Sequence, residues 1–196
     1  FNIRLARALK PEGIPVIYYI SPQVWAWKKK RLRTIARCVS LMLVIFPFEE
    51  ALYRDAGVPC AYVGHPLLDH LADYVPARRF DGDPVIGVLP GSRAQEIARL
   101  MPLMAELARG IRRRHRGARF VVPVVDDARA AQVRAQSEGF PFEVVAGGMY
   151  DVLAQARFAV VASGTATLET ALFRVPMAIV YKVSPLTYGL ARLLVD

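Results

Sequence analysis

Two short turns rich in glycine and hydroxyl residues are the part of the sequence best suited to chemistry. The first is Leu89-Pro90-Gly91-Ser92-Arg93, and the second is Ala162-Ser163-Gly164-Thr165-Ala166-Thr167-Leu168-Glu169. Each follows a short apolar run typical of a β-strand, 85–89 and 158–161, and each precedes a helical pattern. This order predicts turns at the carboxyl edge of a parallel sheet, where helix N-termini offer unpaired N–H groups and a positive dipole end. The turns therefore predict a site for an anion such as the diphosphate of a nucleotide.

The residues of these turns have distinct expected roles. Arg93 can contact a departing diphosphate directly, which makes it the first candidate for the catalytic electrophile. Gly91 lets the backbone approach closely because it has no Cβ. Glu169 lies one helical turn beyond Thr165 and could accept hydrogen bonds from the hydroxyls of a ribose. The remaining candidates would offer hydroxyl and backbone donors to the phosphates: Ser92, Ser163, Gly164, Thr165, Ala166 and Thr167.

Each candidate also has an ordinary structural interpretation. Arg93 could be a plain surface arginine, the serines and threonines could be helix N-caps, and Glu169 could be an acid favoured by the helix dipole. His65 and Lys182 are weaker candidates for the site. A lone histidine, such as His65 between a glycine and a proline, is more often a structural group.

Composition indicates a globular protein with a sizeable core. The chain has 196 residues and is 54% hydrophobic, and its longest apolar stretch, around Cys38 to Phe48, is too short to span a bilayer. No transmembrane segment or signal peptide is visible in the sequence. Cys38 and Cys60 have no metal-binding or redox spacing, so we expect reduced core thiols in a cytosolic protein.

The net charge of +9 is concentrated near the start of the chain, where residues 1–37 hold nine Lys and Arg against one acid. The segment Ser21-Pro22-Gln23-Val24-Trp25-Ala26-Trp27-Lys28-Lys29-Lys30-Arg31 leads into an amphipathic helix with Lys29, Arg33 and Arg37 on one face. This pattern could be a solvated face beside two core tryptophans. It could also meet an anionic membrane surface, a phosphorylated substrate or nucleic acid. Nucleic acid is not expected, because no recognised binding motif accompanies the charge.

Strands alternate with helices along the chain, which predicts an α/β fold with parallel sheets. A segment containing Pro76, Gly82 and Pro84 is the best linker between two blocks. The first block is expected to contain helix 3–10, strand 16–20, helix 28–37, strand 41–46, helix 48–56 and strand 60–63. The second is expected to contain strand 85–89, helix 95–115, strand 120–124, helix 128–137, strand 142–145, helix 150–156, strand 158–161, helix 165–173, strand 177–181 and a helix from Leu186.

Five motifs occur along the chain in the order Tyr19-x-Ser21-Pro22-x-Val24-Trp25-Ala26-Trp27, Phe46-Pro47-Phe48-Glu49, Val63-Gly64-His65-Pro66-Leu67, Leu89-Pro90-Gly91-Ser92-Arg93-x-x-Glu96 and Ala162-Ser163-Gly164-Thr165-x-Thr167-Leu168-Glu169. With these motifs the chain resembles the lipid-A-disaccharide synthase family over essentially all 196 residues. The Ser-Pro-x-Val-Trp-Ala-Trp string is specific to the family, whereas Gly-Ser-Arg alone would be a weak signal.

The resemblance implies the GT-B architecture, with two Rossmann-like parallel-sheet domains, both incomplete in this chain. Residues 1–72 would belong to the acceptor-binding domain, 73–84 to a linker and 85–196 to a truncated UDP-sugar-binding domain. His65 resembles a family position at the cleft and hinge. The acidic pair Asp81-x-Asp83 fits metal-dependent glycosyltransferases, but it lies in the linker and the family needs no metal. We therefore expect no metal site and no cofactor.

The family's reaction is the transfer of 2,3-diacylglucosamine from its UDP derivative to 2,3-diacylglucosamine 1-phosphate (lipid X). It forms the β-1,6 lipid A disaccharide of Gram-negative lipopolysaccharide, inverts the anomeric centre and releases UDP. Such a step needs a base for the acceptor proton and positive groups for the diphosphate. We expect a cytoplasmic enzyme, peripheral at the inner face of the cytoplasmic membrane.

The sequence departs from the family by lacking its amino-terminal Gly-Glu-x-Ser-Gly-Asp turn. The candidate base would lie upstream of residue 1, so the chain is expected to be an internal fragment that is inactive alone. Another GT-B enzyme of UDP-sugars, such as a 2-epimerase or an N-acetylglucosaminyltransferase, remains an alternative.

Overall fold

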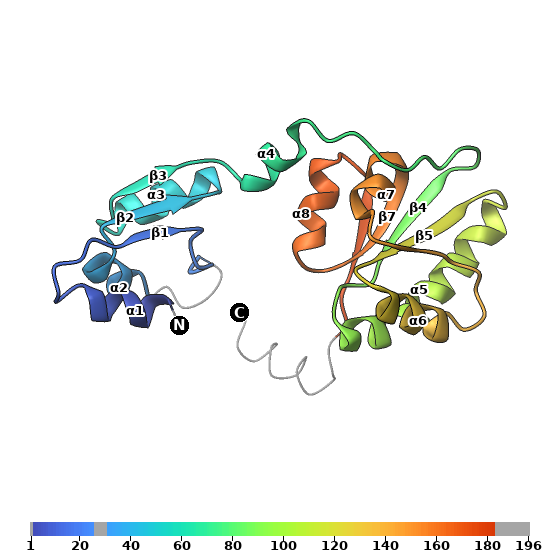
Figure 1. Ribbon diagram of the computed structural model, residues 1–196, viewed down its shortest axis with the longest axis horizontal. Helices are drawn as coiled ribbons and strands as arrows, with labels where there is room; N and C mark the ends of the chain where they lie inside the picture. Colours follow the sequence, from blue (N-terminus) through green and yellow to red (C-terminus); the bar gives the residue numbers. More distant parts are fainter. Residues whose placement is uncertain (1, 26–30, 183–196) are drawn as a thin grey trace. The chain divides into compact units, whose positions relative to one another are not determined.

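The computed structural model describes residues 2–25 and 31–182. The chain divides into two compact units, Phe1–Tyr74 and Val75–Asp196, each with its own parallel sheet (Figure 1). The predicted core position of Trp27, the basic residues 28–30 and the helix expected from Leu186 lie outside the described residues.

The first unit is built on a three-stranded parallel sheet in the order β1-β2-β3. Its buried core gathers apolar side chains from the helices and the middle strand, among them Ile35, Met42 and Val44. Cys38 is buried and Cys60 half-buried, both are free thiols, and burial raises the pKa of each. The elements are α1 (Asn2–Leu9), β1 (Ile17–Tyr19), α2 (Arg31–Cys38), β2 (Leu41–Val44), α3 (Pro47–Asp55), β3 (Cys60–Tyr62) and α4 (Pro66–Ala72).

A buried carboxylate joins two of the sequence motifs in this unit. Glu49 is only 2% exposed, and its oxygens accept hydrogen bonds from the Ser21 hydroxyl and, at 3.2 Å, from the Phe46 N–H. One turn further along α3, the Tyr53 hydroxyl donates to the Pro22 carbonyl at 3.4 Å, and burial raises its pKa to about 12. Because a buried charge is costly unless it is hydrogen-bonded, these contacts fix the loop after β1 onto α3.

The second unit is a five-stranded parallel sheet in the order β6-β5-β4-β7-β8. All five residues of its central strand β4 are buried, as expected for a strand covered on both faces. The strands are β4 (Val85–Leu89), β5 (Arg119–Val124), β6 (Glu143–Ala146), β7 (Ala156–Ala162) and β8 (Met177–Val180), and the helices are α5 (Ala94–Arg114), α6 (Asp127–Gln136), α7 (Met149–Gln155) and α8 (Thr165–Leu172).

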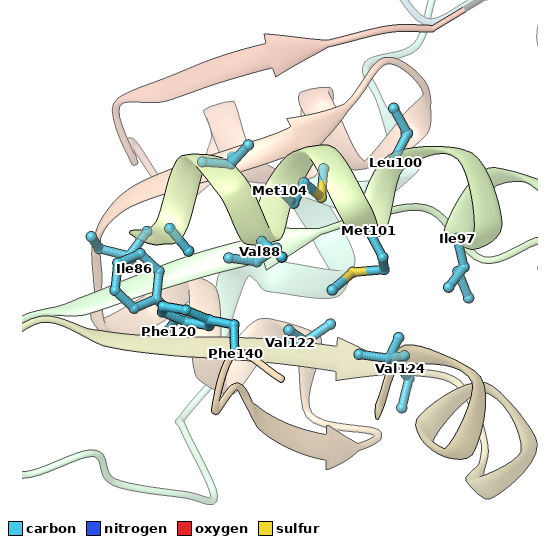
Figure 2. Packing of buried hydrophobic residues seen from close by; sticks show 14 of the residues in the cluster. Ile86, Val88, Ile97, Leu100, Met101, Met104, Phe120, Val122, Val124 and Phe140 are labelled. Carbon is cyan, nitrogen blue, oxygen red and sulfur yellow. The ribbon is translucent and has the colours of Figure 1, made fainter. Parts of the chain in front are cut away.

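Alternate residues of β4 pack into cores on opposite faces of this sheet. Ile86 and Val88 contribute to the cluster under α5 and α6, where Met101 and Phe120 are also buried (Figure 2). Val85 belongs instead to the opposite face, together with side chains of α7. Because successive side chains of a strand point to opposite faces, both faces of this sheet are apolar and both are covered by helices. The unit therefore has three layers, with one sheet between two layers of helices.

The sequence-based assignment of strands and helices is confirmed in the described residues, with ends that differ by a few residues. One element was missed, the seven-residue helix α4. It is too short to show a helical period, although Pro66 at its first position is a recognised start signal.

The predicted linker 73–84 contains no helix or strand, but its residues 77–80 are bonded to the second unit. The Ala77 N–H donates to the buried carboxylate of Asp151 at 2.6 Å, and the Phe80 N–H donates to the Gln155 side-chain carbonyl at 2.9 Å. The Gln155 amide in turn donates to the Arg78 carbonyl at 2.7 Å. These bonds fasten residues 77–80 along α7.

We expect Glu49→Gln to lower the free energy of unfolding of the first unit by about 1 to 2 kcal/mol, since one buried donor loses its charged acceptor. Both tryptophans of the chain belong to residues 1–74, so urea unfolding followed by tryptophan fluorescence reports on this unit. Glu50→Gln is the matched control, because the Glu50–Arg54 pair at 3.0 Å is solvent-exposed and should contribute less than about 1 kcal/mol. Equal losses for the two variants would contradict the role given to Glu49.

Candidate functional site

The two polar turns leave adjacent strands of the second sheet at the same edge. Leu89 at the end of β4 lies opposite Val161 in β7. The chain runs from β4 outward to β5 and β6 on one side, and then returns to β7 and β8 on the other. The strand order thus reverses direction between β4 and β7. At such a topological switch point, open α/β sheets bind their ligands outside the carboxyl ends of the strands.

The conformation of the first turn requires a glycine for reasons internal to the protein. Gly91 has φ +100°, and a Cβ built on it would overlap the Glu96 carboxylate. That carboxylate accepts a hydrogen bond from the Arg93 N–H at 3.3 Å and pairs with the Arg93 guanidinium at 3.1 Å. The Arg93 side chain is 82% exposed, so its charged end faces solvent at the start of α5.

Helix α6 holds the same turn from the side. Arg129 donates from Nε to the Ser92 carbonyl at 3.2 Å, and Gln132 donates to the Ala94 carbonyl at 2.7 Å. Asp126 caps this helix by accepting from the Arg129 N–H at 2.7 Å. Sequence reasoning missed Arg129 and Gln132, whose only local signal is a spacing of three residues within α6.

The second turn presents an open helix N-terminus. The Ser163 N–H continues the pairing with β8 by donating to the Val180 carbonyl at 2.9 Å, and the Thr167 hydroxyl donates to the Gly164 carbonyl at 2.6 Å. Thr165 and Ala166 begin α8, so their N–H groups have no acceptor within the helix.

Gly164 at the N-cap of α8 differs from Gly91. Its backbone is extended, with φ 167°, and apart from its two chain neighbours no described residue has an atom within 4 Å of a Cβ built on it. Nothing in the described protein explains a glycine here.

Lys182, two residues beyond β8, is exposed and follows the strand that pairs with β7 at this edge.

Glu169 has a protein partner at the place predicted for a ribose contact. Its Oε1 accepts a hydrogen bond from the Tyr150 hydroxyl of α7 at 2.9 Å, and the residue is half-buried. Burial, with the hydrogen bond to Glu169, raises the pKa of Tyr150 to about 12. Tyr150 was not foreseen from the sequence, since it lies 19 residues from its partner.

His65 belongs to the first unit and serves there as the N-cap of α4. Its Nδ1 accepts from the Leu67 N–H at 3.1 Å. Its ring lies 5.8 Å from Phe46, which stacks on Phe48, and Trp25 meets Phe48 edge-on at 5.3 Å. Trp25 is 40% and Phe48 54% exposed, so Trp25, Phe46 and Phe48 form a partly exposed aromatic cluster.

The described side chains and helices bear on metal binding and on membrane crossing. Across residues 2–25 and 31–182, no three His, Cys, Asp or Glu side chains gather in a group that could hold a metal ion. Within the same ranges, no helix has the length and apolar character needed to cross a bilayer.

Comparison with known proteins gives one family. The family model described as lipid-A-disaccharide synthetase matches residues 1–196. The lipid-A-disaccharide synthase of Thiobacillus denitrificans is 46% identical over 98% of this chain and 54% of its own length. That of Syntrophus aciditrophicus is 45% identical over 100% of this chain and 54% of its own. The chain thus spans about half the length of these relatives.

Solved structures show the same fold at low sequence identity. A co-structure of S. aureus MnaA with UDP has a TM-score of 0.66 at 11% identity, covering 95% of this chain and 57% of that one. A UDP-GlcNAc 2-epimerase from Neisseria meningitidis, bound to UDP-GlcNAc, has a TM-score of 0.59 at 10% identity, covering 96% of this chain and 59% of that one. At such identities the likeness shows the fold alone, which is the predicted GT-B type.

The contrast between the two glycines makes a testable prediction. Gly164→Ala should leave the melting temperature unchanged and weaken UDP binding by about tenfold or more, because the new methyl group would fill space meant for a diphosphate. Gly91→Ala should instead lower the melting temperature, because an L residue at positive φ is strained. Calorimetric titration with UDP and thermal unfolding of the full-length protein measure both effects. Unchanged UDP affinity in a folded Gly164→Ala variant would remove the second turn from the nucleotide site.

Proposed function

The chain belongs to the lipid-A-disaccharide synthetase family, and from this premise we propose that the full-length protein is an inverting glycosyltransferase of lipid A assembly. The donor would be UDP-2,3-diacylglucosamine and the acceptor 2,3-diacylglucosamine 1-phosphate. The products would be the β-1,6 disaccharide and UDP. The observation that carries the proposal is the pair of turns at the switch point between β4 and β7, whose register brings two helix N-termini to one edge.

In this proposal the second unit holds the UDP group and promotes its departure. The open N-terminus of α8, with Gly164, Thr165 and Ala166, would receive the diphosphate through backbone N–H groups. Ser92, Ser163 and Thr167 would add hydroxyl donors. Lys182 would add a cation at the same edge.

Arg93 is the proposed catalytic electrophile. Its present partner, Glu96, forms a surface ion pair, and such pairs stabilise a protein by less than about 1 kcal/mol. A diphosphate can therefore replace the Glu96 carboxylate at small cost. As the glycosidic bond to UDP breaks, negative charge grows on the diphosphate, and the guanidinium would stabilise that charge more strongly than it does the bound donor.

Glu169 is proposed to contact the ribose while it remains bonded to Tyr150. A carboxylate has two oxygens and about four acceptor positions, so the Tyr150 bond to Oε1 leaves capacity for a ribose hydroxyl. Tyr150 would then fix the orientation of the carboxylate.

We also propose that the first unit meets an anionic membrane surface at the inner face of the cytoplasmic membrane. Both proposed substrates carry acyl chains and phosphate. The aromatic cluster of Trp25, Phe46 and Phe48 is partly exposed, and Arg31 and Arg33 are exposed on α2. Aromatic rings beside cations suit a bilayer interface.

Arg93→Ala should lower kcat by about a hundredfold while UDP affinity falls only a few-fold, because the lost contact strengthens as the diphosphate departs. Steady-state kinetics with both lipid substrates and titration with UDP separate the two quantities. Arg99→Ala, which removes an exposed arginine from the next turn of α5, should retain wild-type turnover. Turnover of Arg93→Ala within a few-fold of wild type would exclude Arg93 as the electrophile.

Reversing the charges of Lys28, Lys29 and Lys30 should weaken co-sedimentation with anionic vesicles by about a hundredfold, since each basic residue at such a surface contributes roughly 1 kcal/mol. The matched control reverses the charges of Arg113, Arg114 and Arg116, which are exposed at the end of α5 in the second unit. It changes the net charge by the same amount. Equal loss in both variants would mean that net charge alone, and not this segment, governs membrane binding. Circular dichroism checks the fold of each.

A further inference from the structure

A cationic pocket in the first unit shares only Arg31 with the surfaces used in the proposals above. Its volume is about 720 Å³, within the range of small-molecule sites. Among the lining residues are six with polar side chains: Asn2, Arg4, Arg7, Tyr18, Arg31 and Thr34.

The pocket lies near the carboxyl end of β1 in the first sheet. Tyr18 is near the carboxyl end of β1, and Arg31 and Thr34 are in the first half of α2, the helix that follows β1 in the chain. Asn2 and Arg4 begin α1, whose other end leads into β1. The starts of two helices thus meet at the carboxyl end of a parallel strand, as they do at the candidate site of the second unit.

The charge of this pocket is one-sided. Arg4, Arg7 and Arg31 line it, and no Asp or Glu among residues 2–25 and 31–182 does. None of these arginines forms an ion pair with a carboxylate in the described part of the chain, whereas Arg54 of the same unit is paired with Glu50 at 3.0 Å. Like charges that face one cavity repel each other, so an anion bound among them would be favoured.

We propose that this pocket binds the phosphomonoester of the acceptor glycolipid, an inference that rests on the proposed function. A phosphate monoester presents three oxygens, which match the planar fork of Arg4 or Arg31. The hydroxyls of Tyr18 and Thr34 can donate further hydrogen bonds. Binding the acceptor by its phosphate would hold the glucosamine at the carboxyl edge of the first sheet and would select phosphorylated acceptors over neutral ones.

The test uses the full-length enzyme and the variants Arg4→Gln, Arg31→Gln and their combination. Each single change should raise the KM for lipid X by about tenfold, with the KM for the UDP-sugar unchanged, because it removes a charge-assisted bond to the acceptor alone. Lys10→Gln, an exposed cation just beyond α1 that does not line the pocket, should leave both KM values unchanged. Tyr18→Phe deletes only a hydroxyl and should raise the KM for lipid X by a smaller factor.

Acceptor lacking the phosphate provides the second measurement. The wild-type enzyme should prefer lipid X over dephosphorylated acceptor, and the double variant should lose most of that preference. Folded variants with an unchanged KM for lipid X would overturn the pocket assignment while leaving the proposed function intact. Wild-type enzyme that does not join the two substrates would instead overturn the proposed function. Variants that lose binding to anionic vesicles without acceptor, yet keep the KM for lipid X in detergent micelles, would show a membrane headgroup site and overturn the proposal.

Discussion

The parallel pairing of β4 with β7 brings the two turns together, and with them the candidate residues that these turns contain. β7 begins 67 residues after β4 ends. The two strands are neighbours because β5 and β6 lie on one side of β4, and the chain then returns through α7 to the other side. The pairing is held by burial on both faces, with Val88 under α5 and Val85 against α7. A shift of one residue in this register would move the two turns apart by about 3.3 Å and turn each side chain to the other face.

Local sequence patterns were sufficient for most of the fold. Short apolar runs predicted the strands, and helical periods between them predicted the helices of both units. These patterns are local because a position that faces the core needs an apolar side chain. The failures have physical causes. Helix α4 is seven residues long and has no buried residue, so no apolar period marks it. The motif that contains Glu49 predicted no role for this residue, since its partner Ser21 is 28 residues away and a hydrogen bond at that separation leaves no local pattern.

At the candidate site, the sequence located the turns but not the contacts that support them. Gly91 and Gly164 looked equivalent, yet the first meets a structural requirement, positive φ beside Glu96, and the second meets none in the described protein. Arg129 bonds to the Ser92 carbonyl from a different helix, a tertiary contact that spacing does not encode. Whether these residues bind a nucleotide remains a prediction, and the structure sharpens it by separating glycines that serve the fold from the glycine that does not.

The hydrogen bonds that fasten residues 77–80 to α7 limit where the chain can pivot. The Ala77 N–H is held by a buried carboxylate, so the backbone from that point onward moves as one piece with the second sheet. Residues 73–76 lie between the end of α4 and this attachment, and the ring of Pro76 fixes its own φ and restricts the residue before it. This segment therefore has fewer free backbone torsions than a linker of the same length without proline.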